Sequence, residues 1–251
     1  MSGTEYETWG AGERVVLVHG SFATGPLEWE GQRVLAELGY QLVVPTRRAY
    51  LPGHAGEGED FLTDGDDVAE LLGNGAHLVG HSYGGLSAMV AAAARPEAVR
   101  SLVLAEPPVF GAAPEHPAVA ALRERTEAVF ARQGTDQEFV DAFLRAVGTS
   151  VEDLPQELVS DMEAMAPAVR LGRPPWGTPV PLGPLAGARF PVLVVSGNHH
   201  PAFTAMCEAL ARDLGAEHRT VEGAGHEVQL VTEGFNAALL ELWRRAGTTT
   251  T

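Results

Sequence analysis

The sequence contains no lysine and no isoleucine, and its only cysteine is Cys207. A single cysteine forms no intrachain disulfide, so nothing in the chain indicates an oxidising compartment. The N-terminus has no basic segment followed by an apolar stretch, and no apolar run approaches the roughly 20 residues that span a bilayer. We therefore expect a soluble, cytoplasmic protein.

Positive charge is also scarce, since 33 acidic residues face 17 arginines and the formal net charge is -16. Nucleic acids and anionic membranes are repelled by such a field, so neither is an expected partner. The charge fits solubility better than steering of a cationic substrate. With 251 residues, 45% of them hydrophobic, the chain can bury one sizeable core. The expected partner is a small-molecule substrate, with a second copy of the chain as a further candidate.

Short apolar runs alternate with helical patterns along most of the chain. Runs that are apolar throughout are typical of parallel strands covered on both faces, so the alternation predicts an α/β fold with a mainly parallel, doubly wound sheet. A weaker segment, 4–9, predicts an antiparallel edge strand. The predicted strands are 15–18, 41–44, 77–79, 101–104, 191–195 and 218–221, and the helices are 29–38, 64–72, 85–95, 201–214 and 234–245.

The alternation breaks within 109–188, where three helical patterns follow one another at 117–132, 136–147 and 155–165. A helical cap inserted between two strands explains this break. The return segment, 172–181, is rich in proline, which disfavours a helix and favours an extended crossing. We therefore predict a core formed by 1–108 and 189–251, with 109–188 as the cap.

A serine flanked by glycines follows the predicted strand 77–79, in the order Gly80-His81-Ser82-Tyr83-Gly84, and an alanine-rich helix follows at once. Glycines are needed where the backbone doubles back beside a neighbouring strand and helix. A strand-to-helix turn of this kind exposes the serine hydroxyl at the carboxyl edge of the sheet. Ser82 is therefore the candidate nucleophile.

A glycine-containing loop, His19-Gly20-Ser21-Phe22, ends the first strong strand. It can turn backbone amides toward the nucleophile, so we expect an oxyanion hole from the N–H groups of Phe22 and Tyr83, with Ser21 as the alternative first donor. His19 is more consistent with bracing this loop than with moving protons.

A second loop, Gly223-Ala224-Gly225-His226, precedes the last predicted helix. A histidine there can accept the proton of Ser82 and return it to a leaving group, provided that another residue orients its ring. Together with His19-Gly20 and the turn at Ser82, this loop resembles the α/β-hydrolase superfamily over nearly the whole chain. The resemblance implies an α/β-hydrolase fold and a catalytic triad that needs no cofactor.

The chain departs from that superfamily at the third member of the triad. Its usual aspartate follows the strand matched by 191–195, but His200 stands at that place in Gly197-Asn198-His199-His200. A histidine offers no stable negative charge to an imidazolium. Glu106, which closes the strand 101–104, is the best replacement and keeps the chain order serine, acid, histidine. The alternatives are a surface or cap-anchoring role for Glu106, or a dyad without an acid.

Several other polar and aromatic residues are expected near the same edge of the sheet. Adjacent histidines point to opposite sides of an extended chain, and no ligand spacing accompanies them, so we predict no metal site. Arg47 and Arg48 either reach an anionic substrate or pair with loop carbonyls and acidic groups. The candidate pocket residues are His19, His81, His199, His200 and Trp176, with Tyr50, His54, Phe139 and Phe143 as further pocket-shaping side chains.

Three functions follow from these residues. The first is hydrolysis of an ester, lactone or other activated acyl group by Ser82, His226 and Glu106. The second is a cofactor-free lyase or cyclase reaction on a small natural-product intermediate, for which the missing aspartate is the reason. The third is a binding protein with residual activity, because the fold alone does not determine the reaction.

Overall fold

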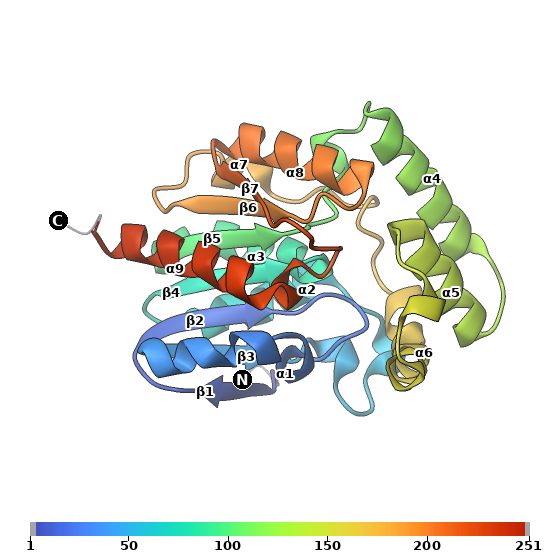
Figure 1. Cartoon of the computed structure of the whole chain (residues 1–251), viewed down its shortest axis with the longest axis horizontal. Coiled ribbons are helices and arrows are strands. Elements are labelled where there is room, and N and C mark those ends of the chain that lie inside the picture. The colour runs from blue at the N-terminus through green and yellow to red at the C-terminus, as the bar shows by residue number, and fades with distance from the viewer. Residues whose placement is uncertain (1–3, 249–251) are drawn as a thin grey trace.

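A computed structural model describes residues 4–248, in which seven strands form one sheet (Figure 1). The strand order is β1-β3-β2-β4-β5-β6-β7. Strand β1 pairs antiparallel with β3, and all other neighbours are parallel, which confirms the predicted sheet and its antiparallel edge strand. The strands are β1 Tyr6–Trp9, β2 Glu13–Val18, β3 Tyr40–Pro45, β4 Ala76–His81, β5 Val99–Ala105, β6 Val192–Ser196 and β7 Glu217–Thr220.

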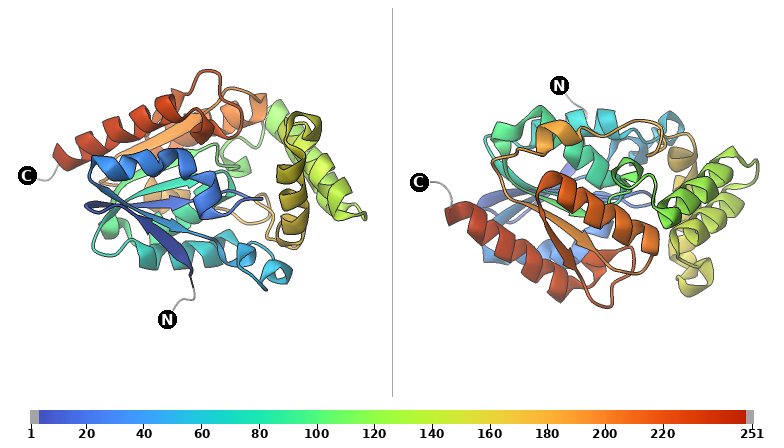
Figure 2. Two further views of the ribbon diagram at one scale, coloured as in Figure 1. Left: turned by 60° about the horizontal axis from the view of Figure 1, so that its bottom comes forward. Right: turned by 90° about the horizontal axis from the view of Figure 1, so that it is seen from above.

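Helices cover both faces of the sheet, as expected for strands that are apolar throughout. The 3₁₀ helix η1 (Glu30–Leu38) and α9 (Thr232–Thr248) pack on one face, in front of the sheet in Figure 1. On the other face lie α2 (Phe61–Leu71), α3 (Tyr83–Ala94) and α8 (Pro201–Leu214). Figure 2 shows the resulting three layers from two further sides. The two apolar clusters fix the strand ends in place.

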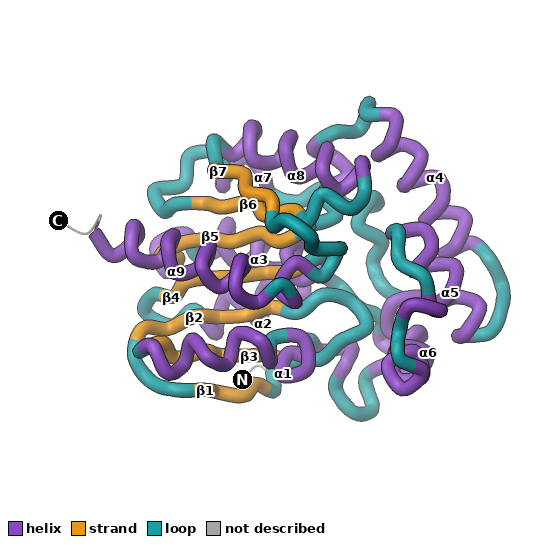
Figure 3. The backbone as a smooth tube through the Cα atoms, in the orientation of Figure 1, coloured by secondary structure: helices purple, strands orange, loops and turns teal. Residues whose placement is uncertain are grey.

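Three helices stand apart from these layers: α4 (Pro117–Ala131), α5 (Asp136–Val147) and α6 (Gln156–Arg170). They lie beyond the carboxyl ends of the parallel strands and fall within the predicted cap (Figures 1 and 3). The remaining helices are short: α1 Gly25–Glu28, α7 Leu182–Leu185, η2 Arg48–Tyr50, η3 Ala55–Glu57, η4 Pro96–Ala98, η5 Phe110–Ala112, η6 Val151–Asp153 and η7 Val228–Leu230.

Two predicted helices differ from the structure. The α-helix predicted over 29–38 is instead the 3₁₀ helix η1, where the buried Gln32 amide donates to the carbonyl of Gln229 and to the side chain of Asn236. Tertiary contacts therefore outweigh the local pattern there. Helix α6 continues past Pro167 to Arg170, although the pattern predicts an end at residue 165. Packing of its last turn against α5 compensates for the hydrogen bond that the proline removes.

Close packing between α2 and α3 depends on Gly65, because a Cβ there would lie 2.5 Å from Cβ of Val90. Alanine improves helix propensity by roughly 0.5–1 kcal/mol, whereas overpacking costs about 1–3 kcal/mol. We expect Gly65→Ala to lower the free energy of unfolding by about 1–2 kcal/mol in urea titrations. Gly183→Ala is the control, since no atom lies within 4 Å of its Cβ position. Equal stability of both variants would contradict the packing argument.

Candidate active site

Ser82 stands on a strained turn between β4 and α3, with φ of 48° and ψ of -124°. Its amide donates to the carbonyl of Ala105 at 2.8 Å, which ties the turn to β5. A Cβ at Gly84 would lie 2.2 Å from the carbonyl oxygen of His19, and one at Gly80 would lie 2.6 Å from that of Gly84. Only glycine fits at both positions, so the local sequence forces the serine hydroxyl outward at the carboxyl edge of the sheet.

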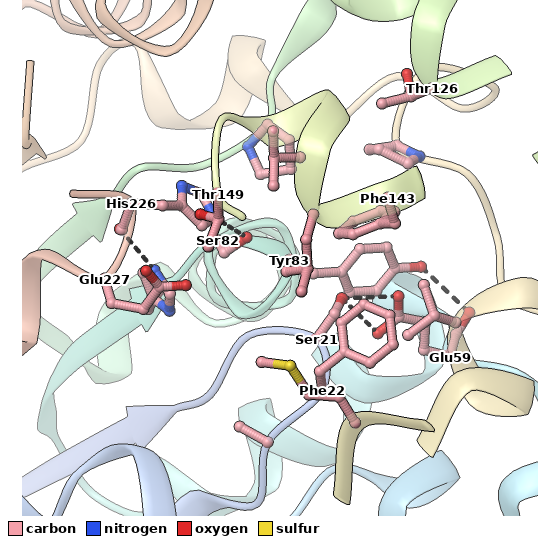
Figure 4. A pocket seen from close by; sticks show the side chains of 18 of the residues that line it. Ser21, Phe22, Glu59, Ser82, Tyr83, Thr126, Phe143, Thr149, His226 and Glu227 are labelled. Atoms are coloured by element: carbon pink, nitrogen blue, oxygen red, sulfur yellow. Dashed lines mark hydrogen bonds between the residues drawn. The ribbon is translucent and has the colours of Figure 1, made fainter. Parts of the chain in front are cut away.

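The imidazole of His226 lies against this hydroxyl, with Nε2 2.9 Å from Oγ of Ser82 (Figure 4). His226 belongs to the loop between β7 and α9, so its contact with Ser82 crosses most of the sequence. The ring of Phe203 packs 4.6 Å from the imidazole centroid, and the His226 carbonyl accepts a hydrogen bond from Nε2 of His81 at 3.1 Å. Ring and backbone of the histidine are both held.

Glu106 is fully buried directly after β5 and faces the other nitrogen of the same imidazole. Nδ1 of His226 lies 3.3 Å from Oε2 of Glu106, while Oε1 accepts from the amide of Gly197 at 2.7 Å. The loop after β6, where the aspartate was expected, therefore supplies an amide that holds the carboxylate from β5. His200 instead caps α8, since its Nδ1 accepts a hydrogen bond from the amide of Ala202. The structure thus brings Ser82, His226 and Glu106 together in one hydrogen-bonded chain.

The loop after β2 was predicted to supply the first oxyanion-hole donor. The amide of Phe22 points to the hydroxyl of Tyr50 at 3.3 Å, so it is engaged within the protein. Within residues 4–248, the amides of Ser21 and Tyr83 donate to no protein group. Both residues line the cavity beside Ser82. These two amides are the ones available to an incoming oxygen.

His19 braces this loop and does not line the cavity. Its Nε2 accepts from the amide of Arg47 at 2.8 Å, so the proton stands on Nδ1, which donates to the carbonyl of Gly20 at 2.7 Å. Burial lowers the pKa of His19 well below its ordinary value, which keeps the ring neutral. The ring therefore acts as a fixed spacer between two loops.

Glu59 is a buried carboxylate with no signal in the sequence, and it forms the floor of the site. It accepts a hydrogen bond from the hydroxyl of Ser21 at 2.8 Å (Figure 4). It also accepts from the hydroxyl of Tyr50 at 2.7 Å and from Nη2 of Arg47 at 2.9 Å. Arg47 also pairs with Asp64 at 3.0 Å and is buried. The guanidinium of Arg47 therefore pairs with groups of the protein itself, and that of Arg48 pairs with Asp67 at 2.7 Å. Neither arginine lines the cavity, so the structure agrees with the predicted pairing to acidic groups and not with contact to an anionic substrate.

His81, which precedes Ser82, forms a buried ion pair that the sequence also did not reveal. Its Nδ1 lies 3.1 Å from Oε1 of Glu28, and its Nε2 faces the carbonyl of His226. Each ring nitrogen therefore has an oxygen acceptor 3.1 Å away, an arrangement that favours the doubly protonated ring. Burial lowers the pKa of His81, but the Glu28 carboxylate outweighs burial and raises the pKa to about 9, with Glu227 contributing in the same direction.

A cavity of about 300 Å³ opens beside Ser82, between the sheet edge and helices α4, α5 and α6. Its walls are mainly apolar, and Trp176 is one of them, packed edge-on against Phe110 and Phe130. Of the predicted pocket residues, His81, Phe143 and Trp176 line it. His199 and His200 do not, because the first faces Glu106 and the second caps α8. Tyr50, His54 and Phe139 also lie outside the lining.

The ligand atoms of Glu106, His199 and His226 lie within 4.8 Å of one another, which is close enough to hold a metal ion.

Within the described part of the chain, no helix has the length and apolar character needed to cross a membrane.

A model of the alpha/beta hydrolase family matches residues 15–238, and the chain belongs to that family. A relative from Gibberella zeae, described as an AB hydrolase superfamily protein, is 35% identical over 103 residues. That match covers 37% of this chain and 35% of the relative, so it spans about a third of either protein.

Solved structures share the fold over nearly the whole chain. A bromoperoxidase from Bacillus anthracis has a TM-score of 0.73 at 21% identity, covering 95% of this chain and 94% of its own. A thermophilic esterase from Thermogutta terrifontis has a TM-score of 0.69 at 24% identity, covering 97% and 93%. Est816, described as an N-acyl homoserine lactone degrading enzyme, has a TM-score of 0.71 at 21% identity, covering 96% and 97%. At these identities the likeness establishes the fold alone.

The ion pair of His81 predicts a pH dependence of stability. Its folded-state pKa, about 9, is above the ordinary value near 6.5, so the stabilisation is fully present below pH 6.5 and is lost as the pH rises through 9. The difference corresponds to roughly 3 kcal/mol. We expect NMR titration to find the His81 ring still protonated at pH 8.

The variant Glu28→Gln removes the anion and should make His81 neutral at pH 8. Its free energy of unfolding should therefore stay constant between pH 7 and 9, where that of the unmodified chain falls. Glu30→Gln, at an exposed neighbouring carboxylate, is the control. A His81 ring that titrates near pH 6.5 in the unmodified protein would disprove the ion pair.

Proposed function

We propose that the chain is a serine hydrolase that cleaves an ester, a lactone or another activated acyl group. The observation that carries the proposal is the hydrogen-bonded chain from Oγ of Ser82 through His226 to Glu106, with separations of 2.9 and 3.3 Å. Nucleophile and base are within hydrogen-bond reach, and a buried carboxylate orients the base, which is the arrangement that activates a serine. Membership of the alpha/beta hydrolase family supports the same reaction class.

In the first half of the proposed reaction, Oγ of Ser82 attacks the carbonyl carbon while Nε2 of His226 takes the hydroxyl proton. The resulting oxyanion accepts hydrogen bonds from the amides of Ser21 and Tyr83, and the Glu106 carboxylate stabilises the imidazolium. The tetrahedral intermediate then expels the alcohol, which leaves with the proton from Nε2. An acyl group remains on Ser82.

Water completes the cycle by attacking the acyl carbon as its proton passes to Nε2. Collapse of the second intermediate releases the carboxylic acid and returns the proton to Oγ of Ser82. The lyase or cyclase alternative rested on the missing aspartate, and the contact of Glu106 with His226 removes that reason. We therefore propose hydrolysis alone.

The triad is tested by Ser82→Ala and Glu106→Gln, assayed on short p-nitrophenyl esters. The first should abolish turnover and labelling by a fluorophosphonate probe. The second should lower kcat by roughly a thousand- to ten-thousandfold, because a neutral amide no longer fixes the tautomer or stabilises the imidazolium. Glu208→Gln, which changes an exposed carboxylate on α8, is the matched control and should retain activity. Turnover that persists in pure Ser82→Ala protein would refute the proposal.

The apolar cavity indicates which substrates are favoured. Walls formed by cap side chains such as Phe143, Leu158 and Met162 suit an alkyl chain next to the scissile carbonyl. Each buried methylene contributes up to about 0.8 kcal/mol, or roughly a fourfold change in affinity. We propose an ester or lactone with an uncharged, apolar acyl group.

In a series of p-nitrophenyl esters from acetate to octanoate, kcat/KM should rise with chain length, by up to about fourfold per methylene. Met162→Gln makes the wall more polar and should flatten this rise. Leu171→Gln is the control, because Leu171 is 60% exposed and does not line the cavity. A preference for acetate over every longer ester would contradict the proposed acyl site.

A further inference from the structure

A second histidine, His199, faces the Glu106 carboxylate. Nδ1 of His199 lies 3.7 Å from Oε2 of Glu106, the oxygen that also meets Nδ1 of His226 at 3.3 Å. Neither Glu106 nor His199 lines the substrate cavity. Within residues 4–248, no hydrogen bond of good geometry reaches the ring nitrogens of His199, whose side chain is only 13% exposed and also interacts with the backbone of Val147. Triad chemistry does not account for this imidazole.

The three ligand atoms lie near the spacing of a zinc site, and a small shift of the two imidazoles toward Glu106 would complete it. They lie within 4.8 Å of one another, and tetrahedral Zn²⁺ with bonds of about 2.0–2.1 Å places its ligands roughly 3.3 Å apart. Two of the separations, 3.3 and 3.7 Å, are already close to that value. Two imidazoles and one carboxylate are typical zinc ligands, whereas Ca²⁺ and Mg²⁺ take mainly oxygen ligands.

We propose that Glu106, His199 and His226 form a zinc site on the side of His226 that faces Glu106, and that zinc bound there inhibits the enzyme. The donor set of two histidines and one carboxylate leaves a fourth position open, for a water molecule. No local sequence spacing identifies this site, because the carboxylate follows β5 while the histidines follow β6 and β7.

The inhibition follows from the tautomer of His226. Without metal, Nδ1 carries the ring proton and donates to Glu106, which leaves the lone pair of Nε2 free to accept the proton of Ser82. Zinc on Nδ1 takes that position, and the displaced proton moves to Nε2. Oγ of Ser82 then faces an N–H donor that cannot accept its proton. Zinc also draws Glu106 away from its role as the orienting acid.

Zinc binding is measured on the full-length chain by competition with a chromogenic chelator, with Zn²⁺ alone as the ligand. We expect one zinc per chain, with Kd raised roughly tenfold or more in His199→Phe and in Glu106→Gln. Phenylalanine preserves the ring contact with Phe203 while removing the ligand atoms. Circular dichroism melting curves check that both variants are folded.

Two controls locate the site. His200→Asn removes the adjacent imidazole but keeps an acceptor that caps α8, and it should bind zinc as the unmodified chain does. Ser82→Ala should also bind normally, since the serine is not a ligand. Unchanged binding in His199→Phe, or an equal loss in His200→Asn, would overturn the proposal.

The inhibitory half of the proposal rests on the proposed hydrolase activity, whereas the binding half does not. Zinc should inhibit ester hydrolysis by the unmodified chain, and a chelator should restore the rate. For His199→Phe, the zinc concentration that halves its own metal-free rate should be at least roughly tenfold higher than for the unmodified chain. Equal sensitivity of both proteins would refute the inhibitory role. A chain that binds zinc but hydrolyses no ester would instead refute the proposed function alone.

Discussion

The hydrogen bond between Glu106 and His226 joins two loops that are far apart in the sequence, and the other contacts of the site support it. The sheet order places β5 beside β6, so the amide of Gly197 reaches Oε1 of the buried carboxylate at 2.7 Å. Because Oε1 is held by this amide, the other carboxylate oxygen, Oε2, faces the imidazole of His226. An ionised carboxylate without such donors is costly to bury, which is why loop and acid depend on each other.

The regular part of the fold was predictable because its strands are buried on both faces and are therefore apolar throughout. Even the edge strand β1 was found from the weak segment 4–9. The errors lie where tertiary contacts decide the local conformation. Gln32 is an example, because its amide donates to groups near the other end of the chain and its helix is 3₁₀ rather than α.

The residues of the site likewise fall into those that the sequence predicts and those that it does not. Ser82 and His226 were predictable because glycine-rich turns mark both residues in the sequence, and Glu106 because the strand that it follows is adjacent to the strand that leads to Ser82. Glu28 and Glu59 were not identifiable. Each is a single carboxylate in a loop or short helix, and its partners, His81 and Arg47, are assigned to it only by the pairing of strands in space. Buried ion pairs leave no periodic pattern in a sequence.

Backbone strain is concentrated at the same edge of the sheet. Within residues 4–248, the non-glycine residues with positive φ are Phe22, Ser82, Glu106 and Asn198, which lie in the loops after β2, β4, β5 and β6. Such conformations cost of order 1–3 kcal/mol each, so they persist only where the surroundings determine them. Here the two apolar clusters hold the strands rigidly up to their last residues. Rigid strands can therefore impose strained turns, which direct Ser82, Glu106 and the neighbouring amides toward one edge of the sheet.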